Sequence, residues 1–315
     1  MQIETKNYKD TVFKLLFNNK LYLLELYNAI NGTSYTNPDD LEITTLEGET
    51  FLKMKNDLSF IIDFELNLYE HQTSKCPNIP LRDLYYVAAT YRKMIPQEKT
   101  YRTNEVKIPA PRFYMFYNGM SDLEDTVTYR LSELFQKPVE DPSIELVVTC
   151  LNVNEGHNKE LMEACKTLNG YSIFVAKVRK YKENAIKQYN FTHTTPLKIL
   201  ADSSDIMKEI VSVAVSKAID ECIEEGVLRD FFMEYREEVQ TVAILEYSAE
   251  RHLQYEKEDS YNSGYDSGHS GGIKDTTALF SWLKKNNRES DILRAIDDPE
   301  FLSKLFEEFS KLKTQ

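Results

Sequence analysis

The most regular pattern of apolar and polar positions in the chain predicts a β-hairpin centred on a polar turn at residues 63–65. A short apolar run precedes the turn, and apolar side chains recur at alternate positions after it. Because successive side chains of a strand point to opposite faces, Glu70 and Gln72 are expected on one face and His71 on the other. Antiparallel pairing then brings Asp57 opposite Glu70 or Gln72, while the acids of the turn are expected to face solvent.

The remaining periodicity predicts helices on both sides of a sheet. Helical spacing and end signals, such as Asn31-Gly32 and Pro80, predict helices at about 8–30, 80–95, 158–168, 172–190, 205–225 and 228–258. Apolar runs predict strands near 41–47, 112–117 and 144–153. This order predicts an α/β protein, with a mixed sheet flanked by helices and a helical C-terminal extension.

Composition changes along the chain and divides it into four predicted parts. We predict a core domain at 1–190, a charged helical extension at 191–258, a linker rich in Gly and Ser at 259–273, and a small helical tail at 274–315. The linker sequence is a poor helix former, and the tail carries apolar residues at helical spacing.

Charge and composition limit the classes of protein that fit. The 315 residues carry a net charge of −13, which argues against an indiscriminately basic nucleic-acid coat but not against a nuclease with a local basic rim. The first half contains such basic clusters, at Lys53, Lys55, Arg92, Lys93, Lys99, Arg102 and Lys107. No run approaches the ~20 apolar residues of a membrane helix. With no signal-peptide core and no Cys-x-x-Cys spacing, we expect a cytoplasmic protein with reduced thiols.

The hairpin brings together residues that suit a divalent metal. Two carboxylates, Asp57 and Glu70, and the amide of Gln72 converge at one end of the predicted hairpin. Ligands that offer only oxygen favour Mg²⁺ or Mn²⁺ over zinc. A salt bridge from Glu70 to a nearby lysine is the structural alternative, because a carboxylate among apolar neighbours needs a partner.

Asp57, Glu70 and Gln72 resemble the core motif of the PD-(D/E)XK nuclease superfamily, with Gln72 where that superfamily usually has lysine. The surrounding residues resemble one branch more closely, the Rpn family of recombination-promoting nucleases, also described as putative transposases. The segments that carry this resemblance are 8–17, 55–60, 69–72, 77–82, 111–113, 116–119 and 152–158. The resemblance covers roughly the first 190 residues, and it is the combination of segments that is specific.

The resemblance implies a PD-(D/E)XK fold and a Mg²⁺-dependent DNA endonuclease of low sequence specificity, with Mn²⁺ as an alternative metal. Asp57 and Glu70 would bind the metal, and Gln72 would hold the attacking water. Gln72 carries no charge, so Lys14, Lys55 or Lys75 is expected to supply the charge of the missing lysine. The implied partner is DNA, with a homodimer or higher oligomer left open, and the implied roles are recombination, transposition-like mobility or defence.

Five further residues are second-tier candidates for the site. Glu25 lies on the first predicted helix, from which the superfamily often contributes an acid, but an exposed helix acid is the alternative. Asp10 and Lys14 belong to the matching motif, although an i,i+4 ion pair would also explain them. Asn56 would shape the hairpin entry or bind substrate. Arg82 would contact a phosphate or form a salt bridge to a site acid.

Two other interpretations stay open. A catalytically degraded nuclease core would serve as a binding or assembly module, with the charged helices at 205–258 as its contact surface. Alternatively, the C-terminal tail alone would carry the biology, by oligomerising or by recognising a partner.

Overall fold

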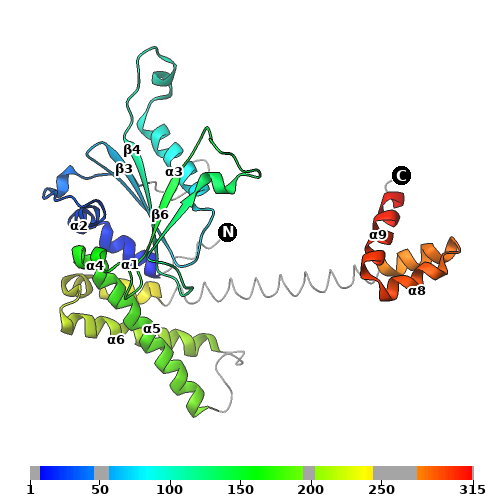
Figure 1. Ribbon diagram of the computed structural model, residues 1–315. Helices are drawn as coiled ribbons and strands as arrows, with labels where there is room; N and C mark the ends of the chain where they lie inside the picture. The colour runs from blue at the N-terminus through cyan, green and yellow to red at the C-terminus, as the bar shows by residue number, and fades with distance from the viewer. Residues whose placement is uncertain (1–7, 46–56, 194–202, 244–274, 314–315) are drawn as a thin grey trace. The chain divides into compact units, whose positions relative to one another are not determined.

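The computed structural model of the chain describes residues 8–45, 57–193, 203–243 and 275–313 (Figure 1). The chain divides into two compact units, residues 1–249 and 250–315, which are described separately. The predicted linker at 259–273 lies outside the described residues, and so does Asn56.

The described residues of the first unit form a six-stranded sheet, and its mixed pairing confirms the prediction. Its strands are β1 (Glu42–Ile43), β2 (Leu58–Ile62), β3 (Glu65–Gln72), β4 (Ala110–Tyr117), β5 (Thr126–Arg130) and β6 (Val147–Asn152). The order across the sheet is β1-β2-β3-β4-β6-β5. Strands β3, β4 and β6 run parallel, whereas β1, β2 and β5 are antiparallel to their neighbours. Strand β5 was not predicted, because it lies at the sheet edge and none of its side chains is buried.

The predicted hairpin is confirmed as β2 and β3. Leu58 pairs with Tyr69, and Ile62 pairs with Glu65 across a two-residue turn. Asp63 and Phe64 form this turn with φ values of 48° and 61°, the left-handed conformation that matches the twist of a tight hairpin. Glu65 was wrongly placed in the turn. It begins β3, and its carboxylate accepts hydrogen bonds from Arg112 Nε and Nη2 at 3.1 and 2.8 Å.

The first predicted helix is two helices, α1 (Tyr8–Phe17) and α2 (Lys20–Asn31). The break occurs because the Asn19 side chain caps α2, accepting a hydrogen bond from Leu21 N at 2.9 Å. The predicted end is confirmed, since Gly32 adopts φ 64° and its N–H bonds to Asn28 O.

The predicted helix at 80–95 is confirmed as α3 (Ile79–Met94), which lies between the parallel strands β3 and β4 in sequence. The later helices have different bounds, because the helix predicted at 158–168 breaks at Cys165. They are α4 (Lys159–Ala164), α5 (Lys166–Thr192), α6 (Ser203–Glu225) and a helix at 229–243. Short 3-10 helices, η1 (Pro38–Asp40), η2 (Gln97–Tyr101) and η3 (Leu131–Leu134), lie in the connections.

Two apolar cores lie in the first unit. In one, Leu66 and Leu68 of β3 pack with Tyr86 and Val87 of α3. The other joins side chains of the sheet, such as Tyr69 and Phe116, to α1, α2, α4, α5, α6 and the 229–243 helix. The helices beyond residue 190 therefore share a core with the sheet. No helix among the described residues is long and apolar enough to cross a membrane.

The second unit is helical, as predicted for the tail. It contains a helix at 275–285, α8 (Glu289–Asp297) and α9 (Pro299–Lys313). Leu279, Leu283, Ala295 and Leu305 form its buried centre. The apolar residues of this unit therefore pack against one another.

Replacement of Gly119 by alanine should destabilise the first unit. A Cβ at this position would lie 2.3 Å from Tyr117 Oη and 2.4 Å from the backbone oxygen of Thr73. Tyr117 is buried and donates to Ser121 O, so its hydroxyl cannot move away without loss of this hydrogen bond. We expect Gly119→Ala to lower the free energy of unfolding by about 1–3 kcal/mol in urea titrations. Gly32→Asn is the control and should cost little, because Asn tolerates the left-handed cap. Equal stability of wild type and Gly119→Ala would contradict this packing.

Candidate functional site

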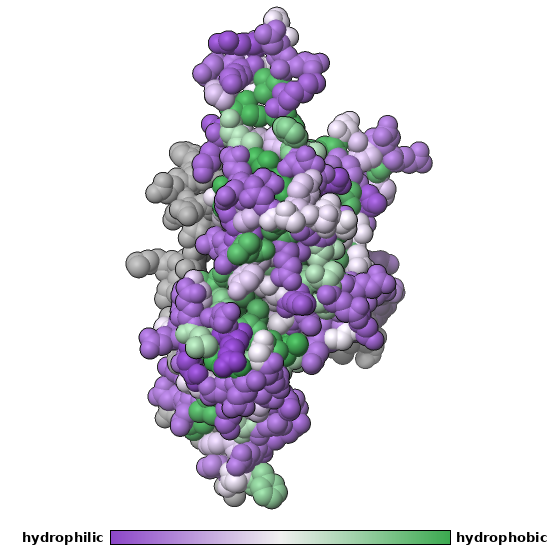
Figure 2. Space-filling view, turned by 90° about the vertical axis from the view of Figure 1, so that its left-hand side faces the viewer, coloured by the Kyte–Doolittle hydropathy of each residue, from purple (hydrophilic) through white to green (hydrophobic). Residues whose placement is uncertain are grey.

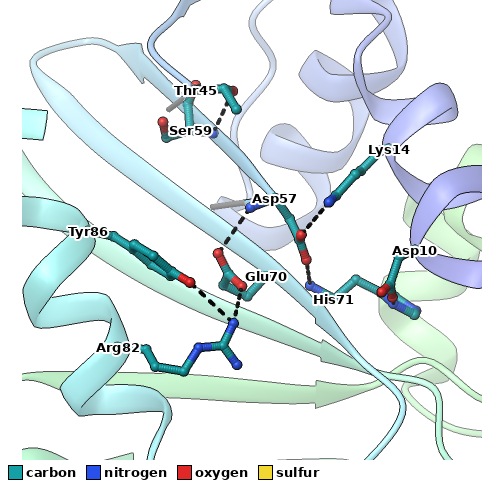
Figure 3. A network of polar contacts seen from close by, with 9 residues as sticks. All are labelled: Asp10, Lys14, Thr45, Asp57, Ser59, Glu70, His71, Arg82 and Tyr86. Carbon is teal, nitrogen blue, oxygen red and sulfur yellow. Dashed lines mark hydrogen bonds and ion pairs between the residues drawn. The ribbon is translucent and has the colours of Figure 1, made fainter. Parts of the chain in front are cut away.

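Asp57 and Glu70 lie side by side where the hairpin opens (Figure 3). The Asp57 N–H donates to Glu70 Oε1 at 3.1 Å, and the His71 N–H donates to Asp57 Oδ2 at 2.8 Å. Each carboxylate is thus hydrogen-bonded to the backbone of the opposite strand. Of the two predicted pairings, the structure has Asp57 opposite Glu70, and the strand register fixes both acids.

Helix α1 contributes two side chains to this end of the hairpin. Lys14 Nζ lies 2.6 Å from Asp57 Oδ1, and the Asp10 carboxylate pairs with His71 Nδ1 (Figure 3). Burial alone would lower the pKa of Lys14, but the charge of Asp57 and its hydrogen bond outweigh burial and raise it. Asp10 and Lys14 are therefore second-tier candidates that the structure brings to the site, each bonded to the hairpin.

Helix α3 contributes Arg82 from the other face of the sheet. Arg82 Nη2 lies 3.1 Å from Glu70 Oε2 and 3.3 Å from the Tyr86 hydroxyl. Its Nη1 donates to Cys76 Sγ at 3.8 Å. Burial alone would lower the pKa of Arg82, yet the charge of Glu70 raises it. Of the two roles expected for Arg82, the structure shows the salt bridge to a site acid.

The Glu70 side chain lies in an environment that disfavours its negative charge. Glu70 is 1% exposed, and this burial raises its pKa well above the usual range. The charges of Asp57 and Asp83 raise the pKa further, and Arg82 offsets them only in part. A buried carboxylate beside two other acids is stabilised by additional positive charge. A cation bound beside Glu70 would therefore stabilise its charged form.

Asp83 is a residue near the site that sequence reasoning missed. It is 1% exposed, and neither carboxylate oxygen has a hydrogen-bond partner among the described residues. Burial raises its pKa to about 8, which the charge of Arg82 opposes and that of Asp57 supports. The signal was present, because Asp83 lies four residues from both Ile79 and Val87, on the apolar stripe of a predicted helix.

His71 joins three elements on the face opposite Glu70, as predicted. Its Nδ1 pairs with Asp10 of α1, and its Nε2 lies 2.8 Å from the Tyr171 hydroxyl of α5. Because both ring nitrogens are occupied and the side chain is buried, His71 has a structural role that holds the backbone N–H bonded to Asp57.

The remaining predicted residues differ in their relation to the site. Gln72 follows Glu70 on the same strand face and is half-buried, and its side chain makes no hydrogen bond to another described residue. Glu25 is not brought to the hairpin, since it accepts from Lys166 N at 2.7 Å and Thr167 Oγ1 at 2.5 Å. It therefore caps α5, a long-range contact without a local sequence signal.

The donor set fits a hard cation held by two carboxylates. Among the described residues, no group of three His, Cys, Asp or Glu side chains is arranged to hold a metal ion. Mg²⁺ is commonly bound by one or two carboxylates, with water and substrate phosphates completing its shell. Asp57 and Glu70 meet that requirement, whereas a structural zinc site needs four nitrogen or sulfur ligands.

Removal of the buried carboxyl of Asp83 should change the pH dependence of stability. Because its folded pKa is raised from near 4 to about 8, the folded state holds the extra proton in this interval. The free energy of unfolding therefore falls as pH rises from about 4 to about 8. We expect Asp83→Asn to be more stable than wild type at pH 8.5, by about 1–3 kcal/mol, and similar at pH 4. Urea unfolding at both pH values checks this, with the exposed turn acid variant Asp63→Asn as control. An unchanged pH slope in Asp83→Asn would refute it.

Searches against protein-family models, curated proteins and solved structures found no match to this chain.

Proposed function

We propose that the protein is a metal-dependent DNA endonuclease of the PD-(D/E)XK type. The observation that carries this proposal is the juxtaposition of Asp57 and Glu70 on paired strands, with Glu70 buried and its pKa raised. The mixed sheet supports it, because the hairpin is followed by α3 and the parallel strand β4, in the order that the resemblance implies.

Asp57 and Glu70 would hold Mg²⁺ or Mn²⁺. A bound cation supplies polarisation of the scissile phosphate and lowers the pKa of water for attack. The two carboxylates are already fixed by backbone N–H groups, so the chain pays little conformational entropy to orient them.

The cationic side chains of the site would stabilise negative charge on the acids and on the phosphate, and would not transfer protons. Lys14 holds Asp57 and is the best placed of the three lysines considered for the missing charge. Lys75 is exposed without a salt bridge to a described residue, and Lys55 lies outside the described residues. Arg82 forms a salt bridge with Glu70 in this structure, and its planar guanidinium is suited to pairing with a phosphate as well.

Gln72 would position the attacking water. Its amide offers two N–H donors and one oxygen acceptor, and these groups are not used in contacts with other described residues. Such a site contacts phosphates rather than base edges, so cleavage should have low sequence specificity. Recombination, mobility and defence are all compatible with this chemistry.

One observation favours a second candidate function, a catalytically degraded nuclease fold that acts as a binding module. Lys14 and Arg82 already form salt bridges with the two acids, and no third acid joins them in a metal-binding group among the described residues. In this case the site would be a structural salt-bridge network, and the charged helices beyond residue 203 would be the contact surface.

Cleavage of supercoiled plasmid by the purified protein separates the two candidates. We expect nicking or linearisation in Mg²⁺ or Mn²⁺ and none in EDTA or Ca²⁺. Asp57→Ala and Glu70→Ala should each lower the rate by at least about 100-fold, since loss of even an outer-shell partner costs up to that much. Asp63→Asn, an acid at the far end of the same hairpin, is the matched control and should cleave normally.

Circular dichroism must show that the variants remain folded. Wild-type rates in Asp57→Ala or Glu70→Ala would show that the site is assigned wrongly. Absence of cleavage by folded wild-type protein in every metal would favour the binding module.

A further inference from the structure

The last residues of α3 and the segment that joins α3 to β4 project from the first unit (Figure 1). We call residues 92–108 the basic arm. No residue in it is buried, and Tyr101 at its tip is 80% exposed. On the face that Figure 2 shows, this projecting end is mostly hydrophilic, with some hydrophobic side chains exposed among the polar ones. A segment of this length without apolar burial contributes little to the core, which is typical of a functional loop.

The basic arm is nevertheless ordered by local hydrogen bonds. At its tip, in η2, Lys99 N bonds to Pro96 O at 3.0 Å and Thr100 Oγ1 to Gln97 O at 2.7 Å. At its base, the Tyr91 hydroxyl donates to Pro109 O at 2.6 Å. The arm therefore has a defined shape before any partner binds, which lowers the entropic cost of binding.

The charge of the basic arm is opposite to that of the whole chain. It contains five basic and two acidic residues, a net charge of +3 in a chain of −13. Lys107 pairs with Glu105 at 2.6 Å. The other four basic residues form no salt bridge with a described residue, and they are Arg92, Lys93, Lys99 and Arg102. Unpaired exposed cations on a projecting segment favour a polyanionic partner.

The outer face of α3 connects the arm to the candidate site. Its exposed positions include Leu81, Tyr85 and Ala88, and the one acid of the helix, Asp83, is buried against the sheet. Arg82 lies at the site end and Arg92 at the arm end, and the ten helical steps from one to the other span about 15 Å. Within α3, whose residues are all described, no exposed acidic side chain lies between Arg82 and the arm.

We propose that the basic arm and the outer face of α3 bind the phosphate backbone of double-stranded DNA, a conclusion that rests on the proposed nuclease function. A duplex carries one charge per about 1.7 Å of its axis, so 15 Å corresponds to about nine phosphates. A duplex with one phosphate at Arg82 therefore presents others to the arm within half a helical turn. Because a duplex is stiff over this length, two contacts at a fixed spacing favour it over a flexible single strand.

The test is binding of the full-length protein to a fluorescent 30-base-pair DNA in EDTA, where no cleavage occurs. Lys99→Ala/Arg102→Ala removes two charges at the tip of the arm. We expect its affinity at 0.1 M salt to fall about tenfold or more, and the slope of log affinity against log salt to fall by about two. Lys159→Ala/Lys166→Ala removes two exposed lysines from α4 and α5, which pack in the other core, and should bind like wild type. The urea midpoints of both variants should match wild type.

The proposal is overturned by equal affinities of the arm variant and wild type, by equal losses in the arm and control variants, or by wild-type protein that does not bind the duplex. Tighter binding of a single strand or of an RNA duplex of the same length would also overturn it. Cleavage is measured separately, so the two proposals fail separately. Arm-dependent binding without cleavage would reject the nuclease and retain the arm, whereas cleavage with arm-independent binding would reject the arm alone.

Discussion

The buried carboxylate of Glu70 is the constraint around which this part of the protein is organised. A charge removed from water is stabilised only by hydrogen bonds and by opposite charge close by. The backbone of the neighbouring strand supplies the hydrogen bond through Asp57 N, and α3 supplies the charge through Arg82. Asp57 in turn forms a salt bridge with Lys14 of α1, which lies on the opposite face of the sheet from α3. Two helices from different cores are thereby fixed to one end of one hairpin.

Local signals were enough to predict the elements that build the site. Strand periodicity located β2 and β3, and Pro80 with helical spacing located α3. Sequence reasoning failed at a helix break set by one capping side chain and at a strand on the edge of the sheet. The side chain of Asn19 divides a helix that looks continuous, and β5 pairs with β6 although none of its side chains is buried.

The contacts of the candidate residues were easier to predict where their partners lie close in the sequence. Strand alternation predicted Asp57 opposite Glu70 or Gln72, and the two-residue turn of the folded hairpin selects Glu70. Glu25 could not be assigned, since its partners lie about 140 positions away at the start of α5. Asp83 could have been identified as a polar residue on an apolar helix face, but the lack of a hydrogen-bond partner for it among the described residues is a property of the folded structure alone.

The hydrogen bond from Ala110 N to Phe64 O ties the start of β4, where the arm ends, to the hairpin turn. Glu70 lies near the other end of the same strand β3, so strand length sets the spacing between the acid and the base of the arm. One inserted residue would turn Glu70 to the wrong face, whereas two would keep its face and add about 7 Å. Insertions in β3 can therefore change the distance between Glu70 and the base of the arm only in steps of two residues.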